Sequence, residues 1–90
     1  MSTSEPKAGE RVTAVRVTED SLTIDVLDGR TVTVPLAWYP RLLHASETER
    51  SNFRITGAGF VIHWPDIDEH LSAQGILAGA PAPRAASHVG

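Results

Sequence analysis

The sequence predicts a small α+β domain made of two antiparallel β-hairpin units, three strands then two, with short helices between and after them. Three observations carry this prediction. β-branched residues alternate with polar ones through residues 11–34, which is typical of half-buried strands. Ser46-x-x-Glu49 has the spacing of a helix capping box. A glycine-rich turn at residues 57–59 separates two further short apolar runs, which indicates a second hairpin.

The first unit contains three expected strands, within residues 11–19, 22–26 and 31–34. A polar turn at residues 19–21 links the first two strands. Pro35 ends the third strand because proline cannot donate a ladder hydrogen bond.

Register within this unit follows from the side-chain alternation around Gly29. A two-residue loop between the second and third strands would set core residues opposite polar ones. A three-residue loop instead pairs Ile24 with Val32 and Leu22 with Val34, which keeps one face apolar. We therefore expect the second register, with Gly29 in a left-handed conformation.

The middle of the chain is expected to be helical. Pro40 suits a first helical turn, so a short turn at residues 36–39 and a helix at residues 40–45 are predicted. A second helix should begin after Ser46 and continue to about Asn52, with its charged positions facing solvent.

The second unit pairs residues 53–56 with residues 60–64. An even loop sets Ile55 opposite Ile62, and Arg54 and His63 then share the other face of the ribbon. A last short helix, residues 73–77, is expected after a Ser72 cap, with Gly79 as its terminator.

The domain is expected to occupy residues 10–79. Residues 1–9 and residues 80–90 are polar or proline-rich without an apolar repeat, so we expect both tails to be disordered. A domain of about 70 residues is near the lower end of independent stability, and dimerisation would enlarge its core.

Composition excludes several functional classes. The chain has 90 residues and no cysteine, which excludes disulfides, thiol catalysis and cysteine-ligated metals. Its net charge of −3 argues against broad nucleic-acid binding, which needs a basic surface. No apolar run approaches a membrane span, and the N-terminus lacks the features of a signal peptide. We therefore expect a cytoplasmic protein that binds neither membrane nor nucleic acid.

Residues 63–70 carry most of the side chains that could support chemistry. A metal site is one reading, because His63, Asp66, Asp68 and His70 lie close together in sequence, although their spacing matches no standard pattern. His63 beside a carboxylate could also serve as a general base. The structural alternative is favoured: Trp64 and Ile67 pack inward, and the aspartates cap turns. No cofactor is expected.

Arginine and aromatic residues in the middle of the chain indicate a protein-contact surface instead. Exposed Trp38 or Tyr39, together with Arg41, Arg50 and Arg54, would form an anchor patch, since such side chains dominate interface energetics. A polar rim beside this patch would consist of His63, Asp66 and Asp68.

Three motifs carry a resemblance to a known family: Trp38-Tyr39-Pro40-Arg41-Leu42, then Ser46-x-x-Glu49-Arg50-x-Asn52-Phe53, then Gly57-x-Gly59-x-x-Ile62-His63-Trp64-Pro65-x-Ile67-Asp68-Glu69-x-Leu71-Ser72. Over residues 12–79 the chain resembles the domain-of-unknown-function 2442 family. It departs from that pattern at Val61, where many members have glycine, and at His70, where an acid is usual.

The resemblance implies a small bacterial α+β domain with no established catalytic activity. Some members are paired with a domain resembling the domain-of-unknown-function 4160 family, an arrangement similar to toxin–antitoxin modules. Others carry a helix-turn-helix segment, which residues 80–90 are too short and proline-rich to supply.

These observations lead to three functional hypotheses. The first, which we favour, is a non-enzymatic protein-interaction module that acts as the antitoxin-like partner of a small toxin-like protein. The second is a small metal-binding or hydrolytic protein centred on His63 and Asp66. The third is a structural homodimer.

Overall fold

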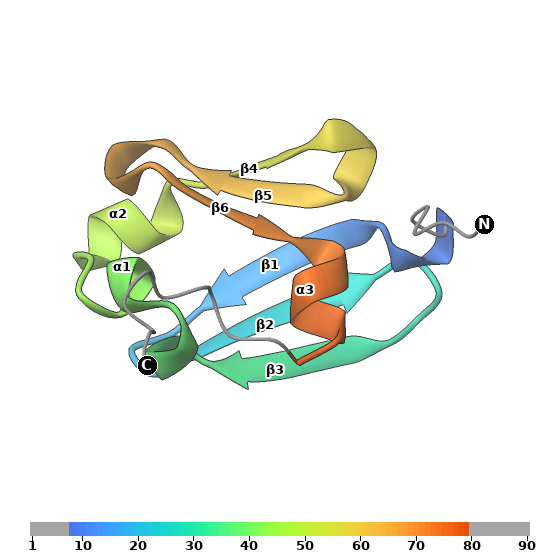
Figure 1. Cartoon of the computed structure of the whole chain (residues 1–90), viewed down its shortest axis with the longest axis horizontal. Coiled ribbons are helices and arrows are strands. Elements are labelled where there is room, and N and C mark those ends of the chain that lie inside the picture. Colours follow the sequence, from blue (N-terminus) through green and yellow to red (C-terminus); the bar gives the residue numbers. More distant parts are fainter. Residues whose placement is uncertain (1–7, 80–90) are drawn as a thin grey trace, which may run out of the picture.

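Residues 8–79 are described by the computed structural model and form two three-stranded antiparallel sheets joined by short helices (Figure 1). The strand order is β1-β2-β3 in the first sheet and β4-β5-β6 in the second. Each sheet is built from strands that follow one another in the sequence. The predicted α+β fold class is confirmed, and the second unit has one strand more than predicted.

Three strands form the first sheet: β1 (Val12–Val17), β2 (Ser21–Val26) and β3 (Thr31–Pro35). Ile24 pairs with Val32 and Leu22 with Val34, which confirms the register expected from a three-residue loop. Gly29 has a φ of 102°, a conformation that side-chain-bearing residues rarely adopt. The alternation of apolar and polar side chains therefore determined this register, and the glycine allows the turn that it requires.

The connection between the sheets consists of η2 (Leu36–Trp38), α1 (Pro40–Leu43) and α2 (Glu47–Ser51). The predicted capping box is present at the start of α2. The Ser46 hydroxyl accepts a hydrogen bond from the Glu49 backbone N–H at 3.1 Å, and the Glu49 carboxylate accepts one from the Ser46 N–H at 2.8 Å. These two bonds satisfy donors that the first turn of a helix otherwise leaves unpaired.

The second sheet and its turns consist of β4 (Arg54–Thr56), η3 (Gly57–Gly59), β5 (Val61–Trp64), η4 (Pro65–Ile67) and β6 (Glu69–Ser72). Ile55 pairs with Ile62, and Arg54 with His63, as predicted. Strand β6 was not predicted, because Leu71 is its single buried residue and it lacks the β-branched alternation of the other strands.

Helix α3 (Ala73–Leu77) follows β6 directly. The Ser72 hydroxyl caps it by accepting a hydrogen bond from the Gly75 N–H at 3.0 Å, as predicted. The helix contacts both β6 and β3, and thus connects the two sheets along one side of the molecule (Figure 1).

One hydrophobic core lies between the inner faces of the two sheets and the short helices. Trp64 and Tyr39 are its largest fully buried side chains. The other buried core residues are Val12, Leu22, Ile24, Val26, Val34, Leu36, Leu42, Ile62, Leu71, Ala73 and Ile76. Both sheets contribute residues to this core, which holds them together as one unit.

The domain begins earlier than predicted. Ala8 and Gly9, expected to belong to the N-terminal tail, lie in the turn η1 (Ala8–Glu10). The Gly9 carbonyl accepts a hydrogen bond from the Asp28 N–H at 3.0 Å, which connects this turn to the β2–β3 hairpin. The remaining parts of the two predicted tails, residues 1–7 and 80–90, lie outside the described residues. None of the helices within residues 8–79 is long and apolar enough to cross a membrane.

Candidate functional site

Two histidines lie side by side on the outer face of the second sheet. His63 of β5 is the cross-strand partner of His70 of β6. Their rings are stacked, with centroids 4.0 Å apart and an interplanar angle of 8°. Because side chains alternate along a strand, Ile62 and Leu71, the neighbours of this pair, point to the core and are buried. The alternation therefore directs the two imidazoles away from the core and toward solvent.

Asp68 lies close to the two histidines, in the turn between their strands. It follows η4 in a left-handed conformation, with φ 54° and ψ 45°. Asp and Asn tolerate this conformation better than most residues do. An oxygen of Asp68 and one ring nitrogen of each histidine all lie within 4.8 Å of one another. We call His63, Asp68 and His70 the His–Asp cluster.

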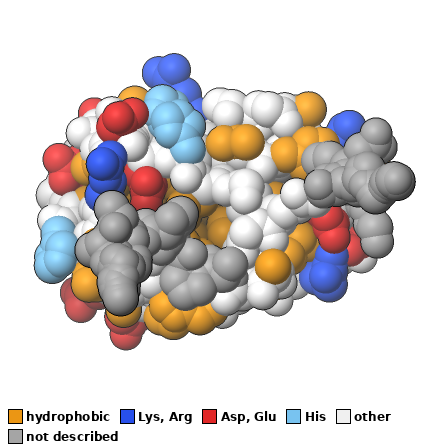
Figure 2. Space-filling model, in the orientation of Figure 1, with side chains coloured by type: hydrophobic (Ala, Val, Ile, Leu, Met, Phe, Trp, Pro, Cys, Tyr) orange, Lys and Arg blue, Asp and Glu red, His pale blue; other side chains and the backbone are white. Residues whose placement is uncertain are grey.

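Figure 2 shows histidine side chains gathered over the second sheet, with a basic side chain beside them. The basic residue paired with His63 across the strands is Arg54 of β4. Arg54 is exposed and makes no hydrogen bond or ion pair within residues 8–79. The outer face of this sheet thus combines two imidazoles, one carboxylate and one free guanidinium.

Arg41, predicted as part of an anchor patch, holds the Asp68 turn in place. Its guanidinium donates hydrogen bonds to the backbone carbonyls of Ile67, at 3.2 Å, and Asp68, at 2.9 Å. These bonds connect α1 to the turn before β6. Both bonds come from Nη1, so this part of the guanidinium is used within the protein.

Arg50 also binds within the protein. Its side chain donates to the carbonyls of Leu42, at 3.0 Å, and Leu43, at 2.7 Å. These carbonyls belong to the last turn of α1, where helix carbonyls lack a partner of their own. Arg50 is half-buried and links the two helices.

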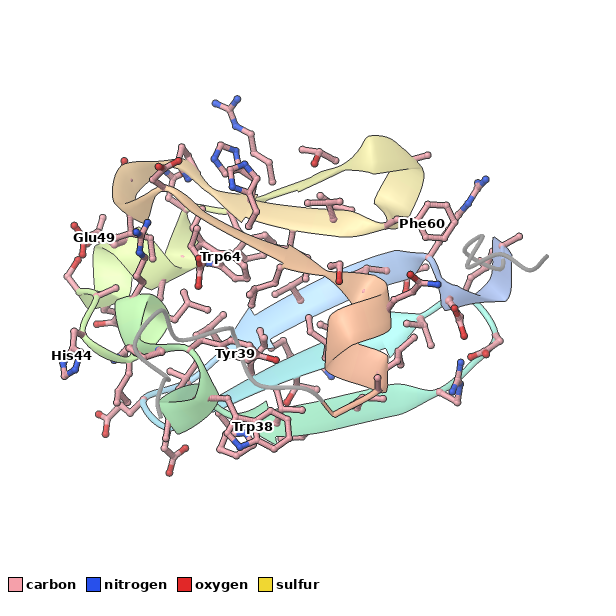
Figure 3. The ribbon with its side chains drawn as sticks, in the orientation of Figure 1. Trp38, Tyr39, His44, Glu49, Phe60 and Trp64 are labelled. Carbon is pink, nitrogen blue, oxygen red and sulfur yellow. The ribbon has the colours of Figure 1, made fainter. Side chains whose placement is uncertain are left out.

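Tyr39 is buried, with 2% of its surface exposed, so the expectation that it lies on an exposed patch is wrong. Burial raises the pKa of its phenol above the ordinary value of 10.0, and the nearby Glu69 carboxylate raises it further. Its hydroxyl has no hydrogen-bond partner within the described residues. Trp38 is half-buried and packs against the Tyr39 ring edge-on, at a centroid distance of 6.4 Å. Figure 3 shows Tyr39 pointing between the sheets and Trp38 lying beside β3.

Asp66 is not part of the His–Asp cluster. Its carboxylate accepts a hydrogen bond from the Asn52 side chain at 3.0 Å, which connects η4 to the end of α2. The sequence-based metal hypothesis was centred on His63 and Asp66, whereas the structure brings His63 together with Asp68 and His70. A hairpin with a loop at residues 65–68 places residue 63 opposite residue 70, so loop length and side-chain alternation at this turn predict the pair.

Comparisons with known proteins agree on the fold. A family model described as a protein of unknown function, DUF2442, matches residues 12–82. A crystal structure of a protein of unknown function from Rhodospirillum rubrum ATCC 11170 is 26% identical, with a TM-score of 0.73. The match covers 87% of this chain and 96% of that chain. No curated protein matches at a significant level. The resemblance stated from the sequence motifs is thereby confirmed.

Proposed function

Because the chain belongs to the DUF2442 family of proteins of unknown function, we propose its function from its own surface: it is a non-catalytic protein-interaction module. The contact surface is the edge of the second sheet formed by β4, together with the outer face beside it. We propose that the module acts in the cytoplasm. Its partner is a small toxin-like protein that presents an extended acidic segment.

The proposal rests on Arg54, whose guanidinium has no partner within residues 8–79. Each of the other described arginines has a partner in the protein: Arg11 lies over the Phe60 ring, Arg16 and Arg30 bind aspartates, and Arg41 and Arg50 bind backbone carbonyls. Within residues 8–79, Arg54 is thus the arginine left free for an external group. Arginine is enriched at the centres of protein interfaces, where it pairs with carboxylates.

The backbone around Arg54 supports the same conclusion. All three residues of β4 are exposed, and β4 is an edge strand in the described sheet. Ile55, at its centre, has 38% of its surface exposed. An edge strand presents unpaired N–H and C=O groups, to which an extended peptide can add as a further strand. An acidic segment added at β4 would pair with Arg54 and cover Ile55.

A non-catalytic role fits the location of the remaining polar groups. The described interior is filled by large apolar side chains such as Trp64, Leu36 and Ile62. A substrate pocket typically encloses several hundred Å³ and buries most of its ligand. The imidazoles and carboxylates lie instead on the outside of the sheet, where they can contact another protein.

The proposal is tested by binding measurements with matched variants. The full chain is used to capture proteins from its native host, and the recovered partner is then titrated against each variant. We expect Arg54→Glu and Ile55→Asp to weaken binding at least tenfold. The control variants are Arg16→Glu on β1 and Leu27→Asp in the β2–β3 turn, which place comparable changes on exposed residues of the first unit and should leave binding unchanged. Equal loss in both pairs, or loss in neither, would contradict the assignment of β4.

Self-association is the alternative that the same edge allows. Two copies of β4 could pair side by side and form one continuous sheet. Sedimentation of the purified chain over a wide concentration range separates the two cases. A monomer at all concentrations supports a different protein as partner, whereas a dimer abolished by Ile55→Asp would show that the edge binds a second copy.

A further inference from the structure

We propose that the His–Asp cluster, His63, Asp68 and His70, is a binding site for a divalent transition-metal ion, with Zn²⁺ as the ion of best fit. This inference goes beyond the interaction surface at β4 and does not depend on it. It rests on three donor groups of suitable chemistry that the hairpin turn and the strand register bring together.

The donor set suits zinc. Two imidazole nitrogens and one carboxylate oxygen are ligands that Zn²⁺ binds in proteins at about 2.0–2.2 Å, and three protein ligands leave a further position for water. Imidazole also suits Ni²⁺ and Cu²⁺, whereas Mg²⁺ and Ca²⁺ prefer oxygen ligands. The chain has no cysteine, so these three groups have no thiolate to compete with them for the ion.

The backbone holds the three groups at a suitable spacing. Donor atoms bound to one tetrahedral zinc lie about 3.4 Å apart, and the cluster atoms lie within 4.8 Å of one another. The two imidazole rings are stacked nearly parallel, so they must rotate out of this arrangement for both nitrogen lone pairs to point at one ion. Cross-strand pairing fixes the two histidine positions. The hydrogen bond from Arg41 to the Asp68 carbonyl, at 2.9 Å, holds the backbone of Asp68 in position.

Arg54 opposes the binding of a cation. It is the cross-strand partner of His63 on the other side from His70, so its positive charge lies on the same face as the cluster. Replacing Arg54 by glutamine removes this repulsion and should tighten metal binding. A metal bound elsewhere on the chain would not respond to this change.

Calorimetric titration tests the proposal on the full chain, without an affinity tag and after chelator treatment. Zn²⁺ should bind at one ion per chain, and Mg²⁺ should not bind. His63→Ala, His70→Ala and Asp68→Asn should each lower the affinity about tenfold or more, since removal of even indirect ligand contacts has effects of that size. Arg54→Gln should raise the affinity.

Two other histidines provide matched controls. His44 is exposed at the end of α1 (Figure 3), and His88 lies outside the described residues. His44→Ala and His88→Ala should bind Zn²⁺ as the unchanged chain does. Circular dichroism of each variant checks folding, and Asp68→Asn keeps a residue type that accepts the left-handed conformation.

Nuclear magnetic resonance gives a second readout that does not depend on variants. Paramagnetic Ni²⁺ should broaden the imidazole signals of His63 and His70 before those of His44. The proposal is overturned if Zn²⁺ does not bind, if the cluster variants bind it unchanged, or if His44→Ala or His88→Ala removes the binding.

Discussion

The indole N–H of Trp64 donates a hydrogen bond to the backbone carbonyl of Arg50 at 3.0 Å. This bond joins the buried face of β5 to α2. Arg50 in turn donates from its side chain to the carbonyls that end α1. One arginine therefore connects two helices and, through its own carbonyl, the second sheet.

Replacement of Trp64 by phenylalanine should destabilise the protein by about 2–3 kcal/mol. The change removes the hydrogen bond to Arg50, leaves its carbonyl unpaired and opens a space in the core, where Trp64 is 0% exposed. Urea denaturation monitored by circular dichroism measures the effect. Trp38→Phe is the control. This change should lower the free energy of unfolding by less, since Trp38 is only half-buried. Equal losses in the two variants would contradict the central role of Trp64.

Replacement of Ser46 by alanine should lower the free energy of unfolding by about 1 kcal/mol. The Ser46 hydroxyl accepts the hydrogen bond from Glu49 that completes the capping box of α2. Thr48→Ala is the control, because Thr48 is exposed on the same helix. If both variants unfold at the same urea concentration, the cap does not contribute to stability.

Replacement of Tyr39 by phenylalanine should not lower stability, and should raise it by up to about 1 kcal/mol. The hydroxyl is buried without a partner in the described residues, and an unpaired buried hydroxyl is unfavourable. The ring, which fills the core, is retained. Urea denaturation measures the change, and a loss of stability would show that the hydroxyl has a stabilising contact.

The single tyrosine of the chain also allows a direct titration. Burial, and then Glu69, raise the pKa of Tyr39, so the fold favours the neutral phenol. This contribution to stability is present below the ordinary pKa and is lost as pH rises through the raised folded value. Tyrosinate absorbance should therefore appear at higher pH in the native protein than in urea. Coincident titrations would contradict the effect of burial.

Asp25 should make a pH-dependent contribution to the first sheet. Hydrogen bonds from Arg16 and then Thr31 lower the pKa of its carboxyl. The resulting stability is present above the ordinary pKa and is lost as pH falls through the lowered folded value. Asp25→Asn should therefore be slightly less stable than the unchanged chain near neutral pH, with the difference shrinking in acid. Urea denaturation of both proteins at several pH values measures the difference, and a difference that stays constant with pH would contradict the role of Asp25.

Local sequence patterns predicted the elements whose form depends on neighbouring residues. The pairing of Ile24 with Val32 followed from alternation, and the capping box followed from the spacing of Ser46 and Glu49. Strand β6 escaped prediction because only Leu71 faces the core, so it has no periodic pattern of its own. Its pairing with β5 comes from the turn at residues 65–68.

The candidate site was predicted less well, since it depends on contacts between distant segments. Composition identified arginines as interface residues, but Arg41 and Arg50 bind carbonyl groups that only the folded chain brings near them. Tyr39 is buried by elements from both halves of the chain, which no local pattern records. Arg54 and His63 were correctly predicted to share a face, because that expectation needed only hairpin register.

The position of α3 between β6 and β3 has a consequence for the order of folding. Each sheet consists of consecutive strands, so each hairpin can form from local contacts soon after its residues are synthesised. Ile76, on the last helix, is fully buried in the common core. A nascent chain that still holds residues 73–77 inside the ribosome therefore exposes part of the apolar surface of both sheets, and chaperones could bind it until those residues emerge.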